Sequence, residues 1–79
     1  MITGAQIRAA RALLDITLSE LEKISVVNQR TLIRYEAQDE VPADRAGNLA
    51  KVRIALEHQG IEFIGTPDHN PGVILKKQF

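Results

Sequence analysis

The chain has 79 residues, 44% of them hydrophobic and 25% charged, which suits one small domain with a single core. It contains no cysteine and no apolar run of about 18 residues, so disulfides, thiolate metal sites, cysteine nucleophiles and membrane spans are excluded. Ten basic and ten acidic side chains give zero net charge, but residues 1–35 carry five basic against three acidic ones, a net of +2.

Two capping boxes mark the first two helices. In a capping box, a Thr side chain and a Gln or Glu side chain three residues later bond to each other's free backbone N–H groups. Thr3 with Gln6 predicts a helix over about residues 4–14, and Thr17 with Glu20 predicts another over about 18–25. The candidate core residues of these two helices are Ile7, Ala10, Leu14, Leu21 and Ile24.

A third helix is expected over about residues 29–37, after a turn at Val26-Val27 and an N-cap at Asn28. Leu32 and Tyr35 are its inward candidates, with Ile33 beside them.

A fourth helix is expected over about residues 44–59, entered through Pro42 and ended by Gly60. Leu49, Val52 and Leu56 repeat at helical spacing, and Ile54 forms a second apolar stripe. A helix with two apolar stripes must pack against two apolar surfaces, here the core and either a hairpin or a second subunit.

After Gly60 the apolar period changes from 3.6 to 2, which predicts a β-hairpin over about 61–77 with strands at 61–64 and 72–77. The Gly- and Pro-containing segment between them has loop chemistry. Because an isolated two-stranded ribbon is barely stable, it must lie on the fourth helix or pair with a partner chain. The expected fold class is therefore a mainly α single domain, residues 1–79, with four helices and a C-terminal β-hairpin.

The third helix carries Gln29, Arg30 and Arg34 on one broad face. Arg pairs well with guanine O6 and N7, and Gln with adenine N6 and N7, so these residue types suit contacts with base edges in the major groove. A solvated polar helix face is the other interpretation of the same pattern.

The stretch Thr17 to Glu36 resembles the lambda-repressor and Cro type of helix-turn-helix, the XRE-like family. The resemblance covers about residues 4–58. It is strongest to small bacterial regulators that begin with a segment like ITGAQIRAARALL and end with one like VRIALEHQGIEFI. It implies a lambda-repressor-like domain that binds double-stranded operator DNA as a homodimer, usually to repress transcription. The last helix of the family would here be replaced by the hairpin.

By position, the resemblance implies that Asn28 caps the recognition helix and reaches a phosphate. Arg11 would pair with Glu36, either as a purely structural ion pair or with a guanidinium edge left for a phosphate. Arg8 would touch a phosphate or point to solvent. The residues implied for DNA binding are Asn28, Gln29, Arg30, Thr31, Arg34, Arg11 and Arg8.

Three positions depart from the family pattern. Leu18 stands where the family has Gln, Glu22 where it has a small residue, and Val26 where the turn often has Gly. Together with the zero net charge, they favour an alternative function: a degenerate helix-turn-helix adaptor that binds a protein, as an antiactivator or antitoxin-like partner, with little DNA binding.

We expect no enzyme activity, cofactor or metal site, because His58 and His69 have no suitable neighbours and no nucleophile–base arrangement is present. We expect a cytoplasmic protein, since the N-terminus lacks the layout of a signal peptide. The expected homodimer forms through the fourth helix and the hairpin, whose apolar residues lie on both faces.

Overall fold

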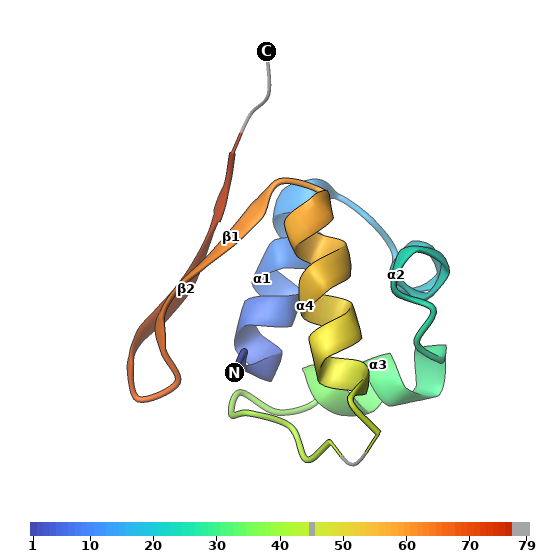
Figure 1. Ribbon diagram of the computed structural model, residues 1–79, viewed down its shortest axis with the longest axis horizontal. Helices are drawn as coiled ribbons and strands as arrows, with labels where there is room; N and C mark the ends of the chain where they lie inside the picture. The colour runs from blue at the N-terminus through green and yellow to red at the C-terminus, as the bar shows by residue number, and fades with distance from the viewer. Residues whose placement is uncertain (45, 77–79) are drawn as a thin grey trace.

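The computed structural model describes residues 1–44 and 46–76, in which four helices are covered on one side by an antiparallel two-stranded hairpin (Figure 1). The helices are α1 (Gly4–Leu14), α2 (Leu18–Ser25), α3 (Gln29–Glu36) and α4 (Asn48–His58), and the strands are β1 (Ile61–Thr66) and β2 (His69–Leu75). The expected class, mainly helical with a C-terminal hairpin, is confirmed. Within these described ranges no helix has both the length and the apolar character needed to cross a membrane.

The capping predictions are confirmed. Thr3 and Gln6 exchange backbone-to-side-chain hydrogen bonds of 2.9 and 3.0 Å at the start of α1. Thr17 and Glu20 do the same at α2, and the Asn28 side chain accepts a 2.8 Å bond from the backbone N–H of Arg30 at α3. These caps fix where the three N-terminal helices begin.

One core joins all four helices and the hairpin. The backbone of α1 approaches α3 so closely at Gly4 that a Cβ there would overlap the carbonyl oxygens of Tyr35 and Gln38. Ile24 and Ile33, expected near the core, are instead 39% and 51% exposed. The largest fully buried side chains are Ile7, Leu21, Val27, Leu32, Tyr35, Leu49, Val52, Leu56 and Ile61.

The fourth helix begins later than expected, at Asn48 rather than near residue 44, and ends at His58. Gly47 precedes it with φ +74°, a left-handed conformation that breaks the helical path. Asp44 supplies the cap from outside the helix: its carboxylate accepts from the backbone N–H of Asn48 at 3.0 Å and of Leu49 at 3.2 Å. A carboxylate expected in the first turn thus caps that turn instead.

The hairpin strands are longer than expected, because only Pro67 and Asp68 form the turn between Thr66 and His69. The register shifts between Ile64 and Thr66, where Gly65 has φ +73°, and this irregularity lets the ladder continue through the segment expected to be a loop. The second strand ends at Leu75 rather than Lys77, and Lys77 lies outside the described residues.

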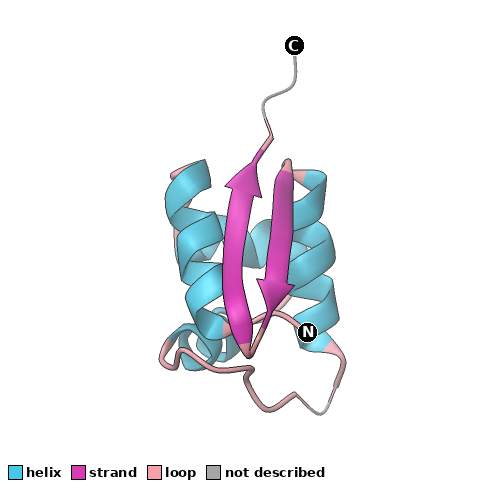
Figure 2. Ribbon diagram, turned by 90° about the vertical axis from the view of Figure 1, so that its left-hand side faces the viewer, coloured by secondary structure: helices cyan, strands magenta, loops and turns pink. Residues whose placement is uncertain are grey.

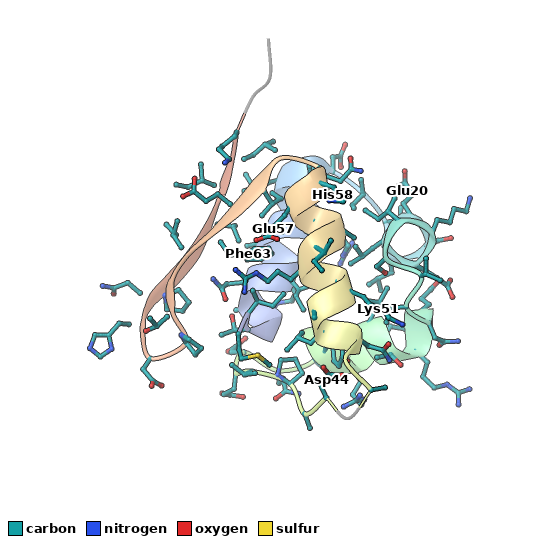
Figure 3. The ribbon with its side chains drawn as sticks, in the orientation of Figure 1. Glu20, Asp44, Lys51, Glu57, His58 and Phe63 are labelled. Carbon is teal, nitrogen blue, oxygen red and sulfur yellow. The ribbon has the colours of Figure 1, made fainter. Side chains whose placement is uncertain are left out.

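The hairpin lies across α1 and α4, with β2 over α1 and β1 over α4 (Figure 2). Its inner side carries Phe63, which points toward the helices (Figure 3). The Gln6 side-chain amide donates to the carbonyl oxygens of Ile64 at 3.2 Å and Gly72 at 2.9 Å, beside the irregularity in the ladder. One side chain therefore caps α1 and fastens the hairpin to it.

Candidate nucleic-acid interface

The outward face of α3 is the candidate interface. Leu32 and Tyr35 are fully buried and hold the helix against the core, so the opposite side faces solvent. Asn28, Arg30 and Arg34 are exposed, while Gln29 and Thr31 are partly exposed. In the part of the chain that the structure describes, no side chain or backbone group accepts a hydrogen bond from the Arg30 guanidinium. The sequence-predicted residues of α3 therefore lie on one accessible surface, with Thr31 at its margin.

Two side chains already accept hydrogen bonds from backbone N–H groups in the first turn of α3. Asn28 uses its carbonyl oxygen on Arg30 N–H. The Glu22 carboxylate accepts from the backbone N–H of Gln29 at 3.2 Å, so it points at the first turn of α3 rather than into the contact between the helices. A carboxylate at this end is favourable to the helix dipole, but it also lowers the attraction of the same end for a phosphate.

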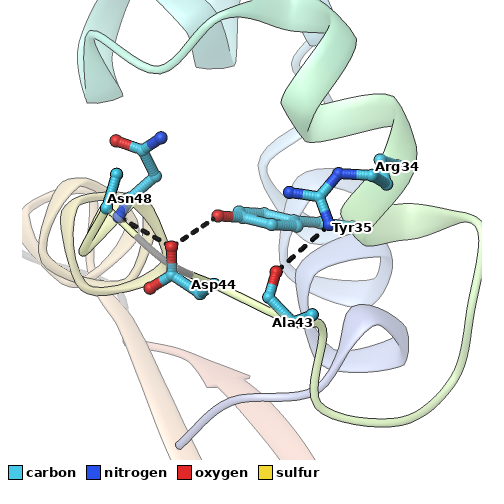
Figure 4. Close-up of a pocket in the computed structure, with 6 residues that line it drawn as sticks. Arg34, Tyr35, Ala43, Asp44 and Asn48 are labelled. Carbon is cyan, nitrogen blue, oxygen red and sulfur yellow. Dashed lines mark hydrogen bonds between the residues drawn. The ribbon is translucent and has the colours of Figure 1, made fainter.

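Arg34 bends toward the connection between α3 and α4. Its Nη1 donates to the carbonyl oxygen of Ala43 at 3.1 Å, and its guanidinium carbon lies 5.1 Å from the centre of the Tyr35 ring (Figure 4). These contacts border a pocket of about 360 Å³ that Asp44 and Asn48 also line. Arg34 therefore occupies the edge of the α3 face, whereas Arg30 occupies its middle.

Tyr35 and Asp44 tie α3 to the start of α4. The Tyr35 hydroxyl donates to Asp44 Oδ1 at 3.0 Å. Burial, and then the hydrogen bond to the carboxylate, raise the pKa of Tyr35 to about 12. Burial raises the pKa of Asp44, but the bonds from Tyr35 and from the first turn of α4 outweigh it, so the pKa of Asp44 is lowered overall. The α3 face is thus held in a fixed orientation to α4.

Arg11 and Glu36 form the expected ion pair. Arg11 Nε and Nη2 each lie 2.9 Å from a Glu36 carboxylate oxygen, and Nη1 donates to the carbonyl oxygen of Ile16 at 3.1 Å. The hydrogen bond with Glu36 raises the pKa of Arg11 above its ordinary value, although burial opposes it. All three guanidinium nitrogens have internal acceptors, which favours the structural interpretation of this pair.

Arg8 is likewise engaged inside the molecule. Its Nη1 donates to the carbonyl oxygens of Glu36 at 2.7 Å and Gln38 at 3.0 Å, and Nη2 pairs with Asp39. A cation at the carboxyl end of α3 satisfies carbonyl groups that the helix leaves free and complements the helix dipole. The geometry brings Arg8 and Arg11 to the α1–α3 contact rather than to the exposed face of α3.

The turn between α2 and α3 passes through Val26, which has φ +59° and is 81% exposed. This left-handed conformation is strained for a β-branched residue. Leu18, the other apolar departure from the family pattern, is partly buried and packs against the core. This packing against the core accounts for its apolar character.

Sequence reasoning missed three contributions to this region: the exposure of Ile33, the contact of Glu22 with Gln29, and the fastening of the hairpin by Gln6. Ile33 was detectable, because a residue one position after buried Leu32 and two before buried Tyr35 points outward on a helix. The other two depend on tertiary approach, for which the sequence carries no local signal.

No model of a known protein family matches this chain, and no curated protein matches it significantly.

Proposed function

We propose that this protein is a cytoplasmic, sequence-specific DNA-binding transcriptional regulator, a repressor, whose α2 and α3 form a lambda-repressor-like helix-turn-helix. The observation that carries the proposal is the exposed face of α3: Arg30 and Arg34 stand on it with Gln29, opposite the buried Leu32 and Tyr35. An α-helix fits the major groove, and guanidinium and carboxamide groups there distinguish base pairs by their hydrogen bonds.

Within this function, the residues have different roles. Arg30, at the centre of the face, reads a base edge, and Gln29 reads a neighbouring one. Arg34 at the margin and the side-chain amide of Asn28 contact phosphates, which set the register of the helix without reading sequence. Arg8 and Arg11 support α3 from behind and do not touch the duplex, since internal acceptors hold their guanidinium groups.

A homodimer is part of the proposal. Ile64 and Ile74 on the outer face of the hairpin are 37% and 45% exposed, and Ile54 on α4 is 52% exposed. Burial of such side chains in a second copy stabilises a small domain, and the open hairpin edges allow strand addition. Two copies would present two α3 helices to half-sites about one helical turn apart.

The alternative function is a protein-binding adaptor with little DNA affinity. The zero net charge of the chain and the Glu22 carboxylate at the first turn of α3 favour it, because both reduce attraction to phosphate.

One experiment separates the two functions. The full chain is titrated with a random-sequence duplex at several salt concentrations, and bound sequences are then selected from a random duplex pool. A DNA regulator gives salt-dependent retention and an enriched site with two-fold symmetry. Absence of retention at low salt would reject the regulator and leave the adaptor.

A further inference from the structure

One apolar side chain lies among the polar groups on the α3 face. Ile33 is 51% exposed. The α-helix turns by about 100° per residue, which places Ile33 about 40° from Gln29 and about 60° from Arg30, between the two. It lies about 160° from Tyr35, so the core cannot bury it without rotating the helix. Ile33 therefore projects between Gln29 and Arg30 on the surface that the proposed function directs at the bases.

The major groove offers few apolar partners for such a side chain. Base edges there present nitrogen and oxygen donors and acceptors, and the C5 methyl of thymine is the apolar group among them. Ile is β-branched, and in a helix one χ1 rotamer dominates, so its methyl groups form a stiff projection. Against thymine, such a side chain excludes water from the C5 methyl group. Against the other bases, it leaves donors and acceptors on the base edge without hydrogen bonds. Ile33 should therefore prefer thymine.

We propose that Ile33 is a specificity-determining residue that packs against the C5 methyl of one thymine in each half-site. The inference rests on the proposed DNA-binding function and adds to it a base preference. Side chains three positions apart on a helix lie about 5–6 Å from each other. Base pairs are spaced by about 3.4 Å. The thymine therefore lies within two base pairs of the base that Arg30 reads.

The test removes only the methyl group. In the duplex selected from a random pool, each thymine is replaced in turn by deoxyuridine, which keeps base pairing and every hydrogen-bonding group. At one position per half-site, the native protein should bind the deoxyuridine duplex about fourfold more weakly, the equivalent of about 0.8 kcal/mol for one buried methyl-sized group. That position should lie within two base pairs of the one whose preference relaxes in Arg30→Ala.

Two variants complete the experiment. Ile33→Ala should bind the thymine and deoxyuridine duplexes equally, and it should fold, since Ala is the better helix former at an exposed position. Leu13→Ala removes another apolar side chain, 46% exposed, from α1 and should keep the fourfold discrimination.

The outcomes distinguish this inference from the function on which it rests. If no duplex is retained and no sequence is enriched, the proposed function fails, and the inference with it. If a sequence is enriched but every deoxyuridine replacement leaves affinity unchanged, the inference alone is overturned. A methyl effect that persists undiminished in Ile33→Ala also overturns it.

Discussion

Arg11 on α1 and Glu36 at the end of α3 are joined by two parallel N–O contacts of 2.9 Å, and the Glu36 side chain is only 8% exposed. This pair, together with Arg8 on the last carbonyl groups of α3, holds the back of the helix whose front faces solvent. These contacts with α1 therefore fix the orientation of the exposed face of α3.

Removing the cation of this pair should be costly. Arg11→Met leaves the Glu36 carboxylate nearly buried without its partner, and we expect a loss of about 3 kcal/mol of unfolding free energy, as for other broken buried pairs. Glu36→Gln should cost less, because the freed guanidinium is 28% exposed and can reach water. Urea unfolding followed by circular dichroism measures both. Equal losses below about 1 kcal/mol would show that the pair does not support α3.

Val26→Gly should stabilise the protein. Val26 adopts φ +59° with its side chain 81% exposed, so the residue contributes backbone strain and little packing. Glycine relieves a left-handed penalty of about 1–2 kcal/mol and loses part of that gain to its greater freedom when unfolded, for a net of about 1 kcal/mol. Val26→Ala, which keeps a Cβ, is the matched control and should gain less. A lower thermal midpoint for the glycine variant would contradict this account.

Asp44 should make the stability of the fold depend on pH in the acidic range, below the unfolded pKa of this carboxyl near 3.8. Its pKa is lowered in the folded state, so the carboxylate contributes stability above its unfolded value, near 3.8, and this contribution is lost as pH falls through the folded value. Asp44→Ala should therefore be less stable than the native chain at pH 7, by about 1 kcal/mol as for other lost helix caps. The difference should shrink below pH 3.8. A gap that stays constant from pH 7 to pH 3 would exclude this role for the carboxylate.

Much of the α-helical part of the fold was predictable because its signals are local. Thr3 with Gln6 and Thr17 with Glu20 fix helix starts within four residues of sequence, and the structure contains both bonds of each pair. The predicted start of α4 was wrong because Gly47 takes a left-handed conformation. Glycine permits this conformation but does not require it.

The hairpin and the support of α3 were less predictable. Gln6 reaches Gly72 across 66 positions of sequence, and Arg8 reaches Gln38 across 30. Such contacts arise from packing, and no periodicity encodes them. The N-cap role of Asn28 and the ion pair of Arg11 with Glu36 were predicted correctly. Ile33 was expected near the core, although its position on the helix directs it to solvent.

Glu22→Gln should strengthen DNA binding if α3 enters the groove. The substitution keeps an oxygen that accepts from Gln29 N–H and removes a negative charge at the first turn of α3, which is worth about 1 kcal/mol, or roughly fivefold in affinity, against a nearby phosphate. Glu57→Gln on α4 makes the same change in net charge away from α3 and is the control. The measurement is filter retention of a duplex at low and moderate salt. Equal affinity gains in both variants would indicate a general charge effect and not a phosphate near Glu22.

The most direct measurement is a gel-shift titration of the selected duplex with the native chain, Arg30→Ala, Arg34→Ala and Arg53→Ala. Arg53 lies on α4, paired with Glu57, so its loss matches the charge change away from the α3 face. Arg30→Ala should lose about 1–3 kcal/mol of binding free energy and accept more sequences, Arg34→Ala should weaken binding similarly to all sequences, and Arg53→Ala should bind as the native chain does. Unchanged affinity in both α3 variants would contradict the claim that this face reads DNA.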